Sequence, residues 1–293
     1  MYTIGYYPGC SLTGSAKEFD KSLRKICDLL GIKLVEIEDW NCCGATSAHA
    51  TNHLLSVSLP LLNIKKAYKQ GITKILAPCA ACYNRLVTAQ YELTKNNLVK
   101  KELSEFLEND YSSIKVINII EFFQEIIKEG ILDKKVVSLK GLKVACYYGC
   151  LLLRPKEIVD FDDSEQPSSM EEIIKITDAT PVDWNYKIEC CGASHSIAHK
   201  DIVVDLIGKI LGDAQKHFAD IMVVACPMCH SNLDMRQLEL RKNEGYKSIP
   251  IIYLTELIGL SLGLSPEELG INLHFIESRS VFEKYFSKVE VQL

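Results

Sequence analysis

The chain has 293 residues, a formal net charge of −5 and twelve cysteines. This cysteine content is below the roughly 8–10% that is typical of small disulfide scaffolds, and a chain of this length buries enough surface to fold without disulfides. The negative net charge makes nucleic acid an unexpected main partner. No uncharged apolar run is long enough for a membrane span, and Met1 to Gly5 lack the basic flank of a secretory signal. We therefore expect a cytoplasmic protein whose cysteines serve metal or redox chemistry.

The first half of the chain is predicted to alternate strands with helices. Ser15 and Glu18 have the spacing of a capping box, which predicts that a helix begins there. In chain order, the expected elements are a strand over 3–7, a helix over 15–30, a strand over 33–37, a helix over 47–70, a strand over 74–77, a helix starting at the next cysteine pair and a strand–helix pair from Val116 to Glu121. Cysteines follow the predicted strands as Cys10, as Cys42-Cys43-Gly44 and as Cys79-Ala80-Ala81-Cys82.

The second half repeats this organisation. Its expected elements are a strand over 142–148, a helix over 194–218, a strand over 221–225, a helix starting at the next cysteine pair and a strand–helix pair from Ile251 to Glu256. The cysteines return as Cys150, as Cys190-Cys191-Gly192 and as Cys226-Pro227-Met228-Cys229. Corresponding cysteines are 140, 148, 148, 147 and 147 residues apart, so five of them keep their order and nearly keep their register.

These patterns predict an α/β fold with two duplicated parallel α/β domains related by a pseudo-two-fold axis. We place the first domain at 1–139, the second at 140–264 and a C-terminal extension at 265–293. The eight extra residues of the second half fall within an acidic loop over 156–169, which we interpret as a solvated turn. The extension is expected to pack on this chain or on a partner.

Every motif cysteine is expected at the end of a strand or the start of a helix. Because the carboxyl ends of parallel strands meet at one edge, each half should gather its five cysteines at one point, where helix N-termini stabilise thiolates. Five thiols exceed the four that zinc or an ordinary cluster takes, and adjacent cysteines suit two irons of a larger cluster. Iron–sulfur is therefore favoured, while zinc in one half and metal-free dithiol chemistry remain alternatives.

The two five-cysteine blocks resemble the paired Cys-Cys-Gly (CCG) domains of the B subunit of heterodisulfide reductase. The phrase Cys146-Tyr147-Tyr148-Gly149-Cys150 with Arg154-Pro155, and the phrase Asp160-Phe161-Asp162-Asp163, are also similar to that family. The resemblance covers nearly the whole chain. After the first pair this chain reads Gly44-Ala45, which places it nearer the broader bacterial and archaeal relatives than the methanogen members.

The resemblance implies an oxidoreductase subunit that reduces a small-molecule disulfide, CoM-S-S-CoB or another, at two noncubane [4Fe-4S] clusters. It also implies two partners, a ferredoxin-like iron–sulfur subunit and a flavin subunit, since the chain has no nucleotide-binding motif of its own. The alternative is an electron-relay subunit of another oxidoreductase complex, without a disulfide substrate. The implied ligands are Cys10, Cys42, Cys43, Cys79 and Cys82 for the first cluster, and Cys150, Cys190, Cys191, Cys226 and Cys229 for the second.

Two cysteines remain outside the ligand sets. Cys27 lies on the apolar face of its predicted helix and is interpreted as a buried spectator thiol. Cys146 lies in a predicted strand, four residues before Cys150, and is interpreted either as a spectator or as an auxiliary thiol of the site.

Several histidines and arginines follow the cysteine motifs. His49 and His195 are candidate proton donors to departing thiolates, or else donors to cluster sulfur or helix caps. His199 and His230 have the same two interpretations. Arg85 and Arg154 are interpreted either as ligands of an anionic substrate tail or as members of surface salt bridges.

Overall fold

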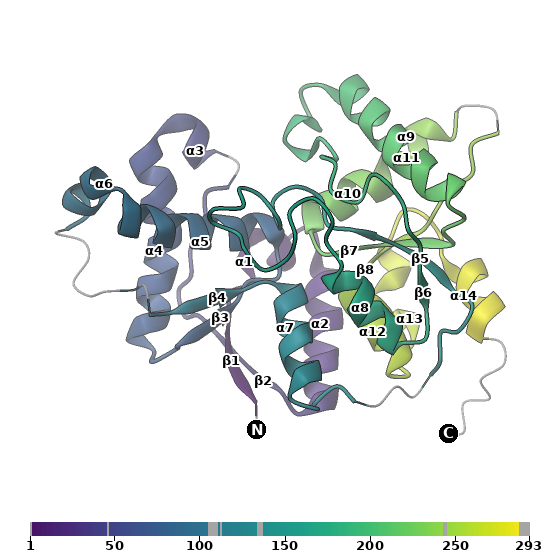
Figure 1. Cartoon of the computed structure of the whole chain (residues 1–293), viewed down its shortest axis with the longest axis horizontal. Coiled ribbons are helices and arrows are strands. Elements are labelled where there is room, and N and C mark those ends of the chain that lie inside the picture. Colours follow the sequence, from purple (N-terminus) through teal and green to yellow (C-terminus); the bar gives the residue numbers. More distant parts are fainter. Residues whose placement is uncertain are drawn as a thin grey trace.

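The computed structural model of the chain describes residues 2–45, 47–104, 111, 113–133, 137–242 and 245–286. Within these residues the chain forms two four-stranded sheets, and every strand pair is parallel. Figure 1 shows the two sheets side by side, the first half of the chain on the left and the second on the right. The predicted duplicated parallel α/β fold is thus confirmed, whereas the domain boundaries at 139 and 264 remain a prediction.

The two sheets have the same strand order, β2-β1-β3-β4 and β6-β5-β7-β8. β7 is apolar and buried at all four positions, as a strand covered by helices on both faces requires. The first sheet contains β1 (Thr3–Tyr6), β2 (Lys33–Glu36), β3 (Lys74–Leu76) and β4 (Lys115–Ile117). The second contains β5 (Lys143–Tyr147), β6 (Thr180–Pro181), β7 (Ile221–Val224) and β8 (Ile251–Tyr253).

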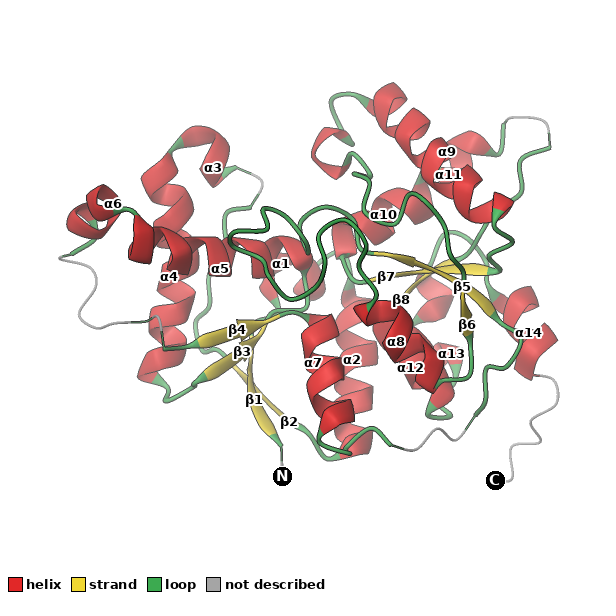
Figure 2. Cartoon of the chain, in the orientation of Figure 1, coloured by secondary structure: helices red, strands yellow, loops and turns green. Residues whose placement is uncertain are grey.

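Helices connect the strands and flank both sheets, as Figure 2 shows. The first half contains α1 (Gly9–Thr13), α2 (Lys17–Leu30), α3 (Ala48–Thr51), α4 (His53–Lys69), α5 (Ala80–Lys95), α6 (Asn97–Glu102) and α7 (Ile119–Lys128). The second contains α8 (Ser169–Ile176), the 3-10 turn η1 (Ala193–His195), α9 (Lys200–Lys216), α10 (Pro227–Met235), α11 (Gln237–Leu240) and α12 (Leu254–Ser261). The chain then continues through α13 (Pro266–Leu269), η2 (Ile271–Leu273) and α14 (Arg279–Phe286).

The two halves pack through helices that hold equivalent places in the repeat. α2, which leads into β2, packs on α12 of the second half, and α8, which leads into β6, packs on α7 of the first. α7 and α12 each follow the last strand of their own sheet. The same type of helix pair therefore forms twice: α2 of the first half with α12 of the second, and α8 of the second half with α7 of the first. This is the contact pattern of a pseudo-two-fold axis.

Three details of the predicted helices were wrong. Ser15 does not cap α2, because the helix begins after Ala16 and no side chain caps it. The helix over 47–70 is broken at Asn52, whose backbone is extended and whose side chain accepts a hydrogen bond from the Leu55 amide. The helix over 194–218 begins only at Lys200, after η1.

The described part of the C-terminal extension, residues 265–286, packs on the chain itself. Asp234 of α10 accepts hydrogen bonds from the backbone amides of Phe275 and Ile276, at 2.7 and 2.9 Å. α13 also packs on α2 of the first half, where Lys21 Nζ donates to the carbonyl of Glu267 at 2.6 Å. The extension therefore joins the two halves.

Candidate metal centre

The first five-cysteine set gathers at the carboxyl edge of the first sheet. Cys43 Sγ lies 3.5 Å from Cys82 Sγ, and Cys42 Sγ lies 4.0 Å from Cys10 Sγ. Cys10 and Cys42 are exposed, whereas Cys43, Cys79 and Cys82 are buried. All five are free thiols, so the set presents soft ligands that run from the interior to the surface.

The second set repeats this geometry closely. Cys191 Sγ lies 3.6 Å from Cys229 Sγ, and Cys150 Sγ lies 4.0 Å from Cys190 Sγ. The outer pair and the buried pair thus occupy the same places in both halves. The structure therefore brings together each set of five that the sequence nominates.

A tyrosine fixes the loop of each set, and a glycine lies against a sulfur of the second set. Tyr7 donates to the carbonyl of Asn41 at 2.7 Å, and Tyr147 donates to the carbonyl of Glu189 at 2.6 Å, so each phenol fixes the loop just before a cysteine pair. Gly149 precedes Cys150 with φ +67°, and a Cβ there would lie 3.2 Å from Cys229 Sγ. Only glycine combines this backbone with so close an approach to sulfur.

Hydrogen bonds within each set favour the thiolate form of Cys43 and Cys190, whereas their partners Cys42 and Cys150 have raised pKa values and favour the thiol form. The amides of Gly44 and Gly192 donate to the sulfurs of Cys42 and Cys190, at 3.4 and 3.3 Å. Hydrogen bonds from the Cys42 and Cys82 thiols hold the pKa of Cys43 below its usual value. A hydrogen bond from Cys150 lowers the pKa of Cys190 to about 6. Thiolates are the form that binds iron, so this donor set suits the chemistry of a cluster.

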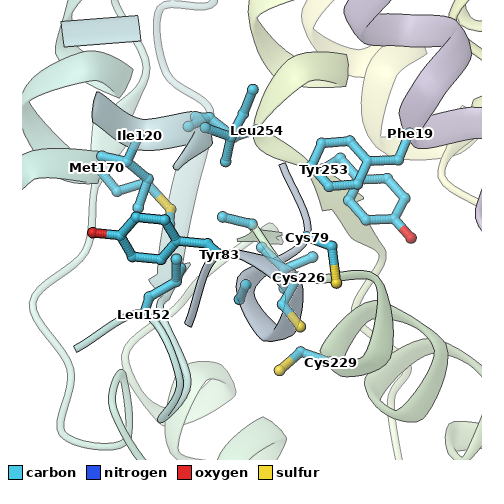
Figure 3. Close-up of a cluster of buried hydrophobic side chains, with 14 of the residues drawn as sticks. Phe19, Cys79, Tyr83, Ile120, Leu152, Met170, Cys226, Cys229, Tyr253 and Leu254 are labelled. Carbon is cyan, nitrogen blue, oxygen red and sulfur yellow. The ribbon is translucent and has the colours of Figure 1, made fainter. Parts of the chain in front are cut away.

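The two sets meet at a buried seam between the halves. Cys79 is the N-cap residue of α5 and Cys226 is the N-cap residue of α10, and the two thiols lie close enough that Cys226 raises the pKa of Cys79 while Cys79 lowers that of Cys226. Figure 3 shows Cys79 and Cys226 next to each other, with Cys229 and Tyr253 nearby. Asn84, which is fully buried in α5, closes the seam by donating to the carbonyls of Leu151 and Arg154 at 3.0 and 2.9 Å.

A cavity of about 160 Å³ opens beside this seam. Its first-half wall includes Ala45, Ala81 and Arg85, and its second-half wall includes Tyr148 and the cysteines of the second set. Among the described residues no group of three or more His, Cys, Asp or Glu side chains is arranged to hold a single metal ion. The residues fit a multi-iron cluster by their number and softness, with ligand roles that remain a prediction.

Comparison with known proteins also shows the duplication. A family model described as a cysteine-rich domain, CCG, matches residues 4–87 and again residues 144–234. The chain belongs to the CCG family. The 8-methylmenaquinol:fumarate reductase membrane anchor subunit of Wolinella succinogenes is 32% identical over 279 residues, which are 94% of this chain and 97% of that protein. The B subunit of the ferredoxin/F420H2-dependent CoB-CoM heterodisulfide reductase of Methanosarcina acetivorans is 28% identical over 294 residues, which are 98% of each.

A solved structure shares the fold of this CCG protein. The crystal structure of a hypothetical protein from Helicobacter pylori matches with a TM-score of 0.72 at 12% identity, over 93% of this chain and 51% of that one. Within the described residues, no helix of the CCG protein is both long and apolar enough to cross a membrane.

The two cysteines outside the CCG sets are buried. Burial raises the pKa of Cys27 in α2 to about 12 and raises that of Cys146 in β5 well above its usual value, so both thiols stay protonated. Cys146 lies near Glu171 and Lys187 rather than near a motif cysteine. These surroundings favour the spectator interpretation for both.

The candidate proton donors of the CCG protein occupy different environments. His195 is exposed in η1 and lies close enough to Cys190 to lower the pKa of that thiol, and His199 lies beside it with ring centroids 5.7 Å apart. His230 is buried against Tyr253, with ring centroids 4.3 Å apart, and bonds the Ile251 carbonyl. The side chain of His49 lies outside the described part of the structure. Of these, His195 and His199 are exposed to solvent, and His195 is the one that acts on the pKa of a motif cysteine.

One residue of the site, Asn84, escaped sequence reasoning. Asn84 carried no signal beyond its place two residues after Cys82, because its partners belong to the other half. Arg154 was noted but pairs with Glu165 at 3.4 Å on the surface, so its place favours the salt-bridge interpretation. Arg85 instead lines the cavity of the seam.

Proposed function

We propose that this CCG protein is the iron–sulfur subunit of an oxidoreductase complex of the heterodisulfide reductase type, and that each five-cysteine set holds one noncubane [4Fe-4S] cluster. The observation that supports this most is the meeting of two equivalent five-thiol sets at one seam, through Cys79 and Cys226. Relatives named as the B subunit of heterodisulfide reductases match nearly the whole chain, which supports the same assignment.

The reaction that we propose is the reduction of a small-molecule disulfide to two thiols, which consumes two electrons and two protons. The clusters would supply the electrons one at a time. The chain's own contribution is to hold the disulfide in the cavity beside the second set and to protonate a departing thiolate from His195, which lies near Cys190. Electrons would come from two partners, a ferredoxin-like iron–sulfur subunit and a flavin subunit.

Iron analysis and disulfide turnover test this proposal together. Protein purified without oxygen should contain about eight irons and about eight sulfides per chain, and its reduced form should be reoxidised by a disulfide. About four irons with one zinc would contradict the two-cluster assignment. Full iron content without turnover of any disulfide would contradict the reaction alone.

A second candidate function is an electron relay that has no disulfide substrate. It is favoured by the relative named as a fumarate reductase subunit, which is 32% identical over nearly both chains and whose name includes a methylmenaquinol. A cavity of about 720 Å³ among α12, α13 and α14, with Leu260, Ile271 and Phe282 in its walls, is large enough for a quinol head. Reduction of the clusters by menadiol, without reoxidation by disulfides, would support this candidate over the first.

A further inference from the structure

An apolar groove lies over α4 and α6 of the first half. Figure 1 shows these two helices together at the end of the first half that lies away from the second half. The groove has a volume of about 810 Å³, and its described walls are mostly leucine: Leu54, Leu55, Leu59, Leu62 and Leu103, with Asn52, Ser58 and Glu102. Leu55 is 42% exposed, and Leu98, one helical turn before Glu102 on α6, is 73% exposed. The groove and Leu98 together form an apolar surface that we call the α4–α6 face.

The α4–α6 face adjoins the loop of the first cysteine pair. Leu59 lines the groove, and its carbonyl accepts a hydrogen bond at 3.0 Å from Nδ2 of Asn41, the residue directly before Cys42. Gly44, directly after Cys43, packs on the same leucine so closely that a Cβ there would lie 2.9 Å from Leu59 Cδ1. Cys42 itself is exposed. A partner on this face would therefore sit on the leucine that holds the loop of the first cysteine pair.

Positive charge surrounds the same face. From α4 to α6, residues 53–102 include eight lysines and arginines but two acidic residues, although the whole chain has a net charge of −5. Lys95 at the end of α5 and Lys100 and Lys101 in the last turn of α6 are all exposed. Within the described residues, no carboxylate pairs with any of these three. Unpaired ammonium groups beside an apolar surface attract a protein whose own surface is acidic.

The corresponding helices of the second half lack this charge. From α9 to α11, residues 200–240 include four lysines and arginines and six acidic residues. Lys209, which is exposed on α9, pairs with Asp205 at 2.8 Å. The two halves share a fold but differ in charge, so the basic character of the α4–α6 face is not a consequence of the duplication. It distinguishes the first half as the one that suits an acidic partner.

We propose that the α4–α6 face is the docking surface for an acidic electron-carrier protein, and that electrons enter the chain through its first half. The choice of an electron carrier rests on the proposed function, whereas the acidic and partly apolar character of the partner follows from the face itself. Carboxylates of the carrier pair with Lys100 and Lys101, and its apolar side chains cover Leu55 and Leu98. Each transfer moves one electron from the reduced carrier to the first metal centre, and no bond forms or breaks.

Two small electron carriers of opposite charge test the proposal. A bacterial two-cluster ferredoxin is acidic, and mitochondrial cytochrome c is basic. Calorimetry of the full chain with its clusters, at low ionic strength, should show that ferredoxin binds at least about tenfold more tightly than cytochrome c. The double variant Lys100→Gln, Lys101→Gln should raise the Kd for ferredoxin about tenfold and weaken its dependence on salt. Leu98→Ser should raise the Kd about fivefold and leave the salt dependence as it is.

Each change has a matched control. Lys209→Gln with Lys216→Gln removes the same charge from α9, the counterpart of α4, where both lysines are exposed. Leu273→Ser removes an apolar side chain that is 62% exposed in the C-terminal extension. Both controls should leave the Kd for ferredoxin unchanged. Equal Kd values for ferredoxin and cytochrome c, or equal effects of the two lysine pairs, would overturn the proposal.

A different occupant of the face would also overturn it. A dimer in analytical ultracentrifugation that Leu98→Ser converts to a monomer would assign the face to a second copy of the chain. Ferredoxin binding that appears only after Glu105→Gln, Glu108→Gln and Asp110→Gln would assign it to this acidic segment of the chain, which lies outside the described residues.

Electron transfer is measured separately from binding. Reduced ferredoxin should bleach the visible absorption of the oxidised chain more slowly when the two α6 lysines are replaced. Binding that depends on these lysines, without any bleaching, would support the docking surface and contradict electron entry through the first half. An iron content that contradicts the two-cluster assignment would instead contradict the proposed function, and the binding measurements would still decide the docking surface.

Discussion

The Nε2 atom of His274 lies 3.1 Å from the Oε1 atom of Glu256, and the two side chains are 2% and 0% exposed. Glu256 also accepts a hydrogen bond from the amide of Tyr253 and so caps α12. This pair therefore fastens the C-terminal extension to the element that packs on α2.

The stability of the fold should fall as pH rises through the pKa of His274. Burial opposes protonation, but the carboxylates of Glu256, Asp234 and Glu18, which face the ring together with neutral His230, raise the pKa of His274 above 6.5. A raised pKa in the folded state stabilises the protein fully below 6.5, and this contribution is lost at higher pH. The free energy of unfolding, measured in urea, should fall between about pH 6 and about pH 8.5. This fall should be about 1 kcal/mol larger in the unchanged chain than in His274→Gln. Equal losses in the two proteins would contradict this assignment.

Single ligand substitutions should remove one cluster at a time. Cys43→Ser and Cys191→Ser should each lower the iron content by about four per chain, because each removes a buried thiol that pairs with another ligand. Cys27→Ala is the matched control: it should keep all the iron and lower the free energy of unfolding by about 1 kcal/mol. Loss of iron in the control would show that Cys27 is more than a spectator.

Asn84→Ala should weaken the seam. It removes two hydrogen bonds to carbonyls of the loop that follows Cys150, and their acceptors are left without this partner. We expect a loss of about 2–3 kcal/mol in the free energy of unfolding, measured by denaturant titration, and a changed EPR signal of the second cluster. Asn96→Ala, which removes the cap of α6 and a hydrogen bond to Glu92, should cost about 1 kcal/mol and leave the signal as it is. An unchanged EPR signal in Asn84→Ala would contradict a role of this amide in shaping the second site.

Gly149→Ala should disturb the second cluster more than its backbone strain explains. Gly149 and Gly130 have nearly the same φ, +67° and +70°, but of these two a Cβ would meet a ligand sulfur at Gly149 and nothing within 4 Å at Gly130. Both variants should lose about 1 kcal/mol of stability. Visible absorption of the clusters should fall in Gly149→Ala alone, and an equal fall in both would refute the steric argument.

The duplicated fold could be predicted because its strands are short apolar runs that end at cysteines. Ile221 to Val224, for example, are apolar at every position, which is typical of a strand in a parallel sheet with helices on both faces. The grouping of Cys43 with Cys82, and of Cys191 with Cys229, follows from the same topology, since strand ends of a parallel sheet share one edge.

Helix starts were harder to predict, because side chains compete locally with the backbone. Asn52 accepts the Leu55 amide and so offers the chain a non-helical turn in the middle of a helical pattern. At Ser15 the competing element is α1: the amide of Ala16 bonds the carbonyl of Ser11, which delays the start of α2.

The contacts at the seam between the halves cannot be predicted from the sequence pattern of any one segment. Asn84 meets Leu151 and Arg154 across the packed halves, at separations of 67 and 70 residues. No periodicity within α5 distinguishes this asparagine from a surface residue. The contact is a property of how two domains dock, and sequence spacing does not carry that information.

The packing of α13 on α2 sets an order of events for the newly made protein. The first half presents the uncovered faces of α2 and α7 until the second half has been synthesised, and Lys21 meets the carbonyl of Glu267 only after α13 has been made. Cys79 and Cys226 become neighbours at the same late stage. The seam therefore needs both halves, and a chain truncated after its first half would carry only one wall of the cavity.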